Sequence, residues 1–518
     1  MNAAQHSSDA PVDAVQELLA EAGVLARPLR ALLALLAEGP RPLDDLIRLS
    51  AVPRRTVEDV LAAAGDDVEQ SADGYRLTAD AAARYRVRFA LDELGSQGST
   101  SSEVLEKLRQ FIATGPKPLT ALDHVSATAE SVLHRAEWFR DNYDLRGARL
   151  LCLGDHDLTS LAVTLVEPSV SVTVVDLDER ILAHIDRISA EHGLGIRTLH
   201  TDLRFGLPPL LEADLVFTDP PYTPEGIGLF ATRAAECLAG PNSRLLIAYG
   251  FSARTPALGH KVQQELLRLG MVFEAILPDF QRYHGAQAIG SASDLYVCQP
   301  TAHTRKLALR QAPGIYTHGP QSVEALEAAA SADLLTAISE RVGADVAALQ
   351  EPGWARPVQP KRGTPVFDLR TDPGPWLLRM LLACNSERAA FLVDNNHPDI
   401  TSEAGQAELN SLVGAKYALR FHRSTPDSKL AIVVADASER ATPHRYLLRR
   451  AHGKIGNAWR EALISVSEDL TKREARDRIS AVAPHAEDLE LRLVDLPRHR
   501  LAELLRAVEQ TALGPVQV

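Results

Sequence analysis

The feature that most constrains this chain is an alternation of short apolar segments with longer amphipathic ones between residues 149 and 298. Apolar segments of this length are typical of buried strands, and helical spacing between them indicates helices, for example over 178–192 and 260–269. We expect strands at 149–153, 171–175, 195–199, 213–218, 244–249, 271–277 and 295–298. Alternating strands and helices predict an α/β fold with a parallel, doubly wound sheet, which binds ligands at the carboxyl ends of its strands.

The length of the chain requires further domains. A chain of 518 residues is too long for a single hydrophobic core. Residues 1–95 predict three short helices and a hairpin around Asp73-Gly74, the pattern of a winged helix-turn-helix domain. We place the doubly wound sheet in residues 116–300, a helical segment and linker in 301–365, and an accessory α/β or α+β domain in 366–518. In that last domain we expect strands at 416–423, 429–436 and 489–495 and helices at 456–482 and 498–510.

The distribution of charged residues along the chain indicates which kinds of molecule the protein can bind. The net charge is −13, with 10 basic and 16 acidic residues over 1–100, 17 and 25 over 101–300, and 28 and 27 over 301–518. An acidic surface repels phosphodiester backbones, so we expect no nucleic acid as partner. Arg54 and Arg55 on the third predicted helix would allow DNA binding, but the local acidity favours an interaction or dimerisation module.

Signals for membranes, secretion and metals are missing from the sequence. No run of about 18 apolar residues and no signal peptide can be read, so we expect a soluble, cytoplasmic protein without a membrane partner. Four cysteines without a CxxC pair argue against a disulfide framework or a zinc cluster, and we expect no metal.

Acidic residues follow four of the predicted strands. The segments are Gly154-Asp155-His156-Asp157, Asp176-Leu177-Asp178, Asp202-Leu203 and Asp219-Pro220-Pro221-Tyr222-Thr223. In a doubly wound sheet these ends line one crevice, where a carboxylate after the second strand can bind the hydroxyls of a nucleoside ribose. Asp176 and Asp202 have an alternative interpretation as helix caps. Two prolines fix the backbone so that the Asp219 carboxylate and the Pro220 carbonyl point at one spot, which suits an amine nucleophile.

These motifs carry a family resemblance. The strings LDHVSATAESVLHRAEWFRDNYDLRG, LCLGDHDLTSLAVTL, VVDLDERIL, TDLRFGLP and FTDPPYT occur in this order. In order and spacing they resemble the branched-chain polyamine synthases, meaning N4-bis(aminopropyl)spermidine synthases, over roughly residues 20–300. The resemblance implies a winged helix followed by a Rossmann-like, class I methyltransferase-type sheet. It also implies transfer of an aminopropyl group from decarboxylated S-adenosylmethionine to a polyamine-like acceptor, with release of methylthioadenosine. We expect a homodimer.

The resemblance also implies roles for individual residues. The predicted catalytic residues are Asp219 as proton acceptor, Pro220, Tyr222 and Asp157. The predicted donor-binding residues are Gly154, Asp155, Asp176, Leu177, Asp202 and Leu203, with Asp202 facing the base. The predicted substrate-binding residues are Asp123, Glu130, His156, Asp178, Thr223 and Glu225.

The loop after the first strand departs from the family and bears on both substrates. The family has three acids there, whereas this chain has His156 between two aspartates, so one certain negative charge is lost and the acceptor amine stays open. The loop holds one glycine where methyltransferases usually show several. Asp155 or Asp157 would repel the carboxylate of intact S-adenosylmethionine, which favours the decarboxylated donor.

Two other functions compete with aminopropyl transfer. Asp-Pro-Pro-Tyr is also the motif of S-adenosylmethionine-dependent amino-group methyltransferases of DNA, in which Tyr222 would stack on a flipped base. The missing Gly-x-Gly and the acidic first 300 residues weigh against that activity. A non-catalytic nucleoside-sensing regulator is the third alternative. We further expect the winged helix to help close the acceptor site, and a chain ending near Pro300 to keep the donor site.

Overall fold

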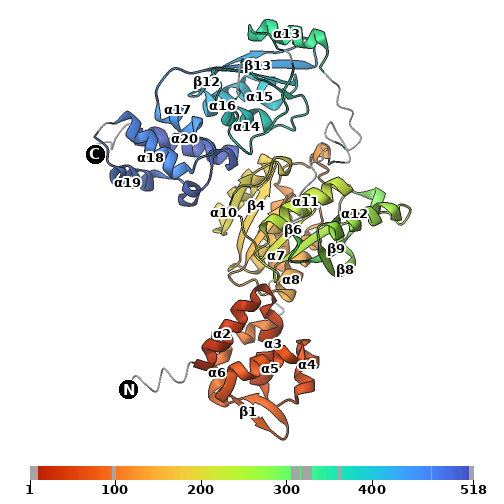
Figure 1. Cartoon of the computed structure of the whole chain (residues 1–518). Coiled ribbons are helices and arrows are strands. Elements are labelled where there is room, and N and C mark those ends of the chain that lie inside the picture. Colours follow the sequence, from red (N-terminus) through yellow and green to blue (C-terminus); the bar gives the residue numbers. More distant parts are fainter. Residues whose placement is uncertain are drawn as a thin grey trace.

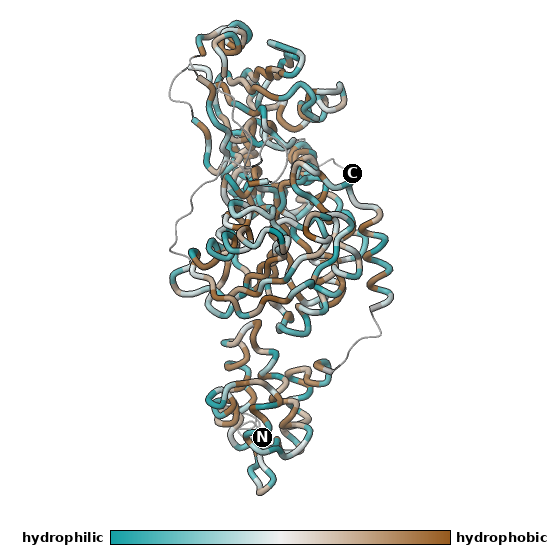
Figure 2. The backbone as a smooth tube through the Cα atoms, turned by 90° about the vertical axis from the view of Figure 1, so that its right-hand side faces the viewer, coloured by the Kyte–Doolittle hydropathy of each residue, from teal (hydrophilic) through white to brown (hydrophobic). Residues whose placement is uncertain are grey.

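Three bodies follow one another along the molecule (Figure 1). The computed structural model describes residues 10–95, 101–209, 211–304, 315–316, 322, 330–346, 348–359, 363–467 and 469–512. A helical N-terminal body, a central α/β body and a C-terminal α/β body lie in chain order from bottom to top of Figure 1. In the perpendicular view of Figure 2 the same order holds, and hydrophobic segments gather inside the central body.

The central body is built on a seven-stranded sheet. Its strands are β3 (Arg149–Leu153), β4 (Ser171–Asp176), β5 (Ile196–His200), β6 (Leu215–Thr218), β7 (Arg244–Tyr249), β8 (Met271–Arg282) and β9 (Ala292–Pro300). Their order is β5-β4-β3-β6-β7-β9-β8, with β3 to β7 parallel and β9 antiparallel to both of its neighbours. The chain reverses direction across the sheet between β3 and β6, where such sheets bind ligands. The predicted doubly wound, class I methyltransferase-type fold is confirmed.

Successive side chains of a buried strand point to opposite faces of the sheet, and both faces are covered by helices, so the strand sequences are continuously apolar. Leu150 and Cys152 of β3 point to the face covered by α8 (Ala129–Asn142), α9 (Thr159–Val166) and α10 (Glu179–His192). Leu151 and Leu153 point to the other face, covered by α11 (Pro224–Cys237) and α12 (Pro256–Arg268). Because helices cover both faces, both sets of side chains must be apolar. α7 (Ser101–Ala113) packs beside α8.

The predicted strand bounds are wrong mainly at the edge of the sheet. β8 continues to Arg282 rather than ending at Leu277, and β9 begins at Ala292 rather than Leu295. These two strands pair in a long antiparallel hairpin whose register shifts between Phe273 and Ala275 and again between Leu277 and Gln281. Since β8 is a half-exposed edge strand, its outer part lacks the apolar run on which the prediction depended.

The N-terminal body contains helices and one hairpin. They are α2 (Ala10–Ala22), α3 (Ala26–Glu38), α4 (Leu43–Ser50), α5 (Arg54–Ala64), β1 (Val68–Ser71), β2 (Gly74–Leu77) and α6 (Ala79–Arg88). Its contacts with the central body lie next to the amino ends of the strands. Arg30 donates to Asp144 (3.3 Å), shortly before β3, and Asn242, shortly before β7, donates to the Glu21 carbonyl (2.9 Å).

The C-terminal body has its own four-stranded sheet. The order is β10-β11-β13-β12, from β10 (Val366–Leu369), β11 (Arg388–Asp394), β12 (Tyr417–His422) and β13 (Leu430–Ala437). One face packs against α14 (Trp376–Ala383), α16 (Glu403–Val413), α17 (Pro443–Arg449), α18 (Ile455–Val466), α19 (Lys472–Val482) and α20 (Arg498–Ala512). The short helix α15 (Pro398–Thr401) lies beside α16. On the other face lies α13 (Ala332–Val342), part of the predicted segment 301–365, much of which falls outside the described residues.

One prediction for the C-terminal body is wrong. Residues 489–495 form no strand and instead run through two short 3-10 helices, Ala486–Glu490 and Leu493–Asp495. Leu493 and Val494 are both fully buried, so consecutive residues face the core and the alternation of a strand is absent. Residues 456–482 are mainly helical, as predicted, and the Thr471–Glu474 capping box starts the second of their two helices.

Candidate functional site

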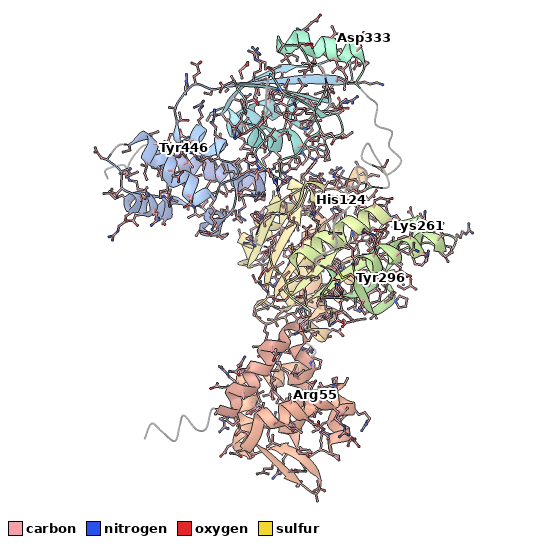
Figure 3. All side chains as sticks on the ribbon, in the orientation of Figure 1. Arg55, His124, Lys261, Tyr296, Asp333 and Tyr446 are labelled. Atoms are coloured by element: carbon pink, nitrogen blue, oxygen red, sulfur yellow. The ribbon has the colours of Figure 1, made fainter. Side chains whose placement is uncertain are left out.

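A cavity of about 430 Å³ opens at the carboxyl ends of β3, β4, β5 and β6. The predicted site residues that line it are Asp123, Gly154, Asp155, His156, Asp157, Asp176, Leu177, Asp202, Leu203, Asp219, Pro220 and Tyr222. His124, labelled in Figure 3, also lines it and lies at the end of the central body that faces the C-terminal body. The topology of the sheet therefore brings together segments that are far apart in the chain.

Four predicted substrate-binding residues lie outside this lining, and their role stays a prediction. Glu130 is exposed on α8 and accepts a hydrogen bond from Arg109 (2.7 Å). Asp178 caps α10 and pairs with Arg180 (2.6 Å). Thr223 caps α11 and is buried, whereas Glu225 is exposed in the first turn of that helix. Two of these four side chains thus cap helices and two are exposed, and the Asp178 carboxylate lies 3.9 Å from Nδ1 of His124, which lines the cavity.

Asp219 is held between two phenols. Its Oδ1 accepts a hydrogen bond from the Tyr222 hydroxyl (2.9 Å) and its Oδ2 accepts one from the Tyr283 hydroxyl (2.6 Å). The two hydroxyl oxygens lie 3.0 Å apart. Burial, together with the nearby Asp157 carboxylate, raises the pKa of Asp219 to about 7. A carboxyl group tuned in this way can accept a proton near neutral pH.

Three buried aspartates, Asp155, Asp157 and Asp176, also line the cavity, and one of them lies beside a buried guanidinium. Asp157 accepts the backbone N–H of Ala127 (2.8 Å) and lies 3.4 Å from Nη2 of Arg135, which is fully buried. Asp176 accepts the backbone N–H groups of Asp155 (2.9 Å) and Asp178 (2.7 Å). Burial raises the pKa of Asp155 to about 7 and that of Asp176 to about 6. When these carboxyls ionise, the cavity is negative overall and attracts cations.

Two histidines stack beside these carboxylates. The rings of His124 and His156 lie 4.3 Å apart and are nearly parallel, at 18°. Nε2 of His156 lies 3.3 Å from the Ser126 hydroxyl. Burial lowers the pKa of both histidines, so both imidazoles are neutral at pH 7. His156 therefore places an uncharged ring between the two aspartates of this loop.

Residues beyond 300 also reach the cavity. Ile315 and Tyr316 line it, and the Ile315 carbonyl accepts a hydrogen bond from Thr223 (2.7 Å). Asp202 accepts a hydrogen bond from the indole of Trp376 in α14 (3.0 Å). Two later segments thus fold back onto the cavity, and the expectation that a chain ending near Pro300 keeps the donor site stays a prediction.

The N-terminal body stands apart from the cavity. Its described residues contribute nothing to the lining, and its contacts lie at the amino ends of the strands. Arg55 and His124 accordingly lie far from each other along the molecule in Figure 3. Within a single chain the N-terminal body therefore does not help close this cavity, because the parallel sheet lies between the two, and a role in the expected homodimer stays a prediction.

Sequence reasoning missed Arg135 and Tyr283. Arg135 donates to Thr159 (2.5 Å) and Gln281, and Tyr283 donates to Asp219. Arg135 lies on α8 within the string LDHVSATAESVLHRAEWFRDNYDLRG, where no role is predicted for it, and Tyr283 lies just beyond β8 in no recognisable motif. An arginine among apolar residues in LHRAEWF is the only signal that could have marked Arg135.

Within the described residues, no group of three or more His, Cys, Asp or Glu side chains is arranged to hold a metal ion. Likewise, none of the described helices combines the length and apolar character needed to cross a bilayer.

Comparison with known proteins identifies one domain. Residues 103–303 match the branched-chain polyamine synthase A C-terminal domain. The chain is 33% identical over 217 residues to an uncharacterised protein of Methanocaldococcus jannaschii, covering 42% of this chain and 54% of that one. It is 32% identical over 188 residues to the N(4)-bis(aminopropyl)spermidine synthase of Thermococcus kodakarensis, covering 35% and 53%. It thus spans about half the length of these curated relatives.

A solved structure is similar over a longer span. The branched-chain polyamine synthase of Thermus thermophilus, in complex with N4-aminopropylspermidine and 5′-methylthioadenosine, is 23% identical with a TM-score of 0.36. The similarity covers 61% of this chain and 98% of that one.

Proposed function

We propose that this protein is an aminopropyltransferase, because residues 103–303 match the branched-chain polyamine synthase A C-terminal domain. It moves an aminopropyl group from decarboxylated S-adenosylmethionine to an amine nitrogen of a polyamine-like acceptor and releases methylthioadenosine. The observation that carries this proposal is the cavity itself, whose lining includes the carboxyl groups of Asp155, Asp157, Asp176 and Asp219 and so concentrates negative charge. Such a field suits two cationic substrates, a sulfonium and a polyamine.

The chemistry needs an uncharged amine next to a proton acceptor. The amine nitrogen attacks the aminopropyl carbon next to sulfur, so that a C–N bond forms while the C–S bond breaks and its electron pair stays on sulfur. Before the attack, Asp219 accepts a proton from the acceptor's ammonium group, which frees the nitrogen lone pair, and the secondary or tertiary ammonium that forms stays protonated. Tyr222 and Tyr283 donate to that carboxylate and fix its orientation. Ammonium groups have a reference pKa of about 10.4, so a site that lowers the cost of removing one proton is required.

The donor occupies the side of the cavity formed by the ends of β4 and β5. Asp176 lies at the end of β4, where a carboxylate can bind ribose hydroxyls. Asp155 and Asp157 follow β3, where they would attract the ammonium of the decarboxylated donor and repel the carboxylate of intact S-adenosylmethionine. No metal is required for this transfer.

Other partners remain predictions. We propose that the protein is a cytoplasmic homodimer and that it binds no nucleic acid. The acidic balance of the first 300 residues supports the second point, because an acidic surface repels phosphate backbones. Sedimentation velocity of the purified full chain tests the dimer, and a single species of 56.2 kDa would contradict it.

The activity is tested by incubating the full chain with either donor and a panel of linear polyamines, followed by mass spectrometry. We expect methylthioadenosine and a product heavier by one or two aminopropyl groups, formed only with the decarboxylated donor. A methylated product formed from intact S-adenosylmethionine, without aminopropylation, would overturn the proposal in favour of a methyltransferase. Binding of methylthioadenosine without any product would favour a nucleoside-sensing regulator.

A further inference from the structure

We propose that the C-terminal body braces the nucleoside half of the cavity, and that Trp376 is a positioning residue that acts through Asp202. The inference rests on the proposed function, because it requires a nucleoside donor. It also assigns to residues 366–512 a role for which their sequence shows no motif. Two separate attachments carry it, one at the end of β5 and one at the start of α10.

The first attachment is a hydrogen bond from Trp376 that takes up the last acceptor position of the Asp202 carboxylate. Oδ1 accepts the backbone N–H of Arg204 (3.0 Å) and its Nε (2.8 Å), and Oδ2 accepts the indole N–H of Trp376 (3.0 Å) and Nη2 of Arg204. A carboxylate offers about four acceptor positions. All of them are taken within the protein, so Asp202 has none left for a base. We therefore revise its predicted role: it holds the wall of the cavity in place and does not itself bind the base.

Trp376 is held rigidly. It is the first residue of α14, whose N-terminus is capped by the Asp372 carboxylate through the N–H groups of Trp376 (3.0 Å) and Leu377 (2.8 Å). Its ring packs edge-on against Phe205, with centroids 5.4 Å apart, and the Arg204 guanidinium lies 4.9 Å from the indole. Because both the helix end and the ring are fixed, the indole N–H is presented to Asp202 in one orientation.

The second attachment holds the start of α10. Glu179 is the first residue of that helix and directly follows the Asp176-Leu177-Asp178 loop. It pairs with Arg379 of α14, which is fully buried, and lies 3.5 Å from Nε of Arg498 in α20. In Figure 1, α10 is accordingly the helix of the central body next to the C-terminal body. The loop proposed to hold the ribose is therefore fixed by cations from another domain.

Both attachments lie directly behind the cavity lining. Asp202 and the next residue, Leu203, line the cavity, and so do Asp176 and Leu177. A change in the indole contact leaves one buried acceptor of Asp202 unsatisfied, which favours movement of the β5 end. The expected consequence is weaker binding of the nucleoside, with the reacting groups at the end of β6 unaffected.

The test compares Trp376→Phe with Trp354→Phe in the full chain. Trp354 packs on the same Phe205 ring (4.3 Å) and on Trp376 (6.2 Å), but it is not a donor to Asp202, so it controls for the loss of an indole in this cluster. For Trp376→Phe we expect the Kd of methylthioadenosine, measured by calorimetry, to rise about tenfold, as for a buried acceptor left unpaired. The KM of the donor should rise in parallel while kcat stays within about twofold of the wild type.

A second readout separates positioning from a general loss of packing. The melting temperature should fall by a similar amount in both variants, whereas the Kd of methylthioadenosine should rise only in Trp376→Phe. If Trp376→Phe does not fold, Glu179→Gln supplies the test from the central body, and we expect about a threefold rise in Kd with kcat retained.

The outcomes distinguish the brace from the proposed function. If the wild type binds methylthioadenosine and both Trp376→Phe and Glu179→Gln bind it equally well, the brace is wrong and the aminopropyltransferase stands. Equal weakening by Trp376→Phe and Trp354→Phe also overturns it. A wild type that binds no methylthioadenosine overturns both.

Discussion

The N-terminal and C-terminal bodies are attached to the central sheet by the same kind of interaction but at opposite ends. Arg30 is buried and donates to the carbonyls of Phe89 (2.9 Å) and Ala90 (2.8 Å) and to Asp144. Arg379 is buried and pairs with Glu179. Since ligands of a doubly wound sheet lie at the carboxyl ends of its strands, only the second attachment lies next to the site. The end of the sheet to which a domain is attached thus decides whether it can influence the chemistry.

The largest expected effect comes from an Asp-to-Asn substitution made separately at each end of the central sheet. Asp219→Asn removes the proton acceptor at the carboxyl end and should lower kcat by about a hundredfold or more, with methylthioadenosine binding retained. Asp144→Asn, at the amino end, should leave kcat unchanged. Steady-state assays with calorimetry measure both. Near-full activity of Asp219→Asn would show that the proton goes elsewhere.

The pH dependence of kcat/KM should also be set by a residue at the carboxyl ends of the strands. Because the pKa of Asp219 is raised to about 7, kcat/KM should fall below that pH, by up to about tenfold per pH unit, as the carboxyl takes up a proton. Arg30→Met should show the same profile as the wild type. If the residual kcat/KM of Asp219→Asn still falls below about pH 7, that fall is caused by the titration of another group.

Stability should change with pH in the opposite direction. Buried Asp155, Asp176 and Asp219 have folded-state pKa values of about 6 to 7, above the value of about 3.9 expected for the unfolded chain. The folded state therefore binds more protons between about pH 4 and 7, and stability falls as pH rises through that window. Melting temperatures measured across it without ligand should decrease, and Asp219→Asn should reduce the slope. A rise in stability with pH that Asp219→Asn leaves unchanged would contradict this assignment.

Matched arginine variants test the two attachments directly. Arg30→Met and Arg379→Met each leave a buried charge network incomplete and should each destabilise the fold by about 3 kcal/mol. Only Arg379→Met should also weaken methylthioadenosine binding, by about fivefold at a temperature where both variants are folded. Thermal melts and calorimetry measure the two effects. Equal weakening by Arg30→Met would remove the distinction between the ends.

The smallest expected effect concerns DNA. Arg54 is paired with Asp44 (2.9 Å) and lies 3.7 Å from Glu58, so its charge is largely neutralised within the N-terminal body. We expect no sub-micromolar binding of duplex DNA at physiological salt and no change in Arg55→Glu, as measured by fluorescence anisotropy. If the protein binds duplex DNA tightly, with a steep salt dependence, and Arg55→Glu abolishes that binding, the N-terminal body is a DNA-binding domain.

The amino-acid sequence by itself determined the sheet and the residues at its strand ends. Alternating apolar and amphipathic segments specify a parallel doubly wound sheet, and the carboxyl ends of such strands converge on one edge. Asp155, Asp176, Asp202 and Asp219 each follow one of these strands, so their positions in the chain are enough to place them in one crevice. Only local pattern and a general rule of topology are needed for that step.

Tertiary structure decided which partners these carboxylates have. Arg135 meets Gln281 146 residues away, and Trp376 meets Asp202 174 residues away. These contacts depend on how helices and domains pack at particular angles, which hydrophobic periodicity does not encode. The sequence therefore located the acidic crevice, whereas packing between distant elements decided that Asp202 is saturated, that Tyr283 holds Asp219, and that the C-terminal body reaches the site.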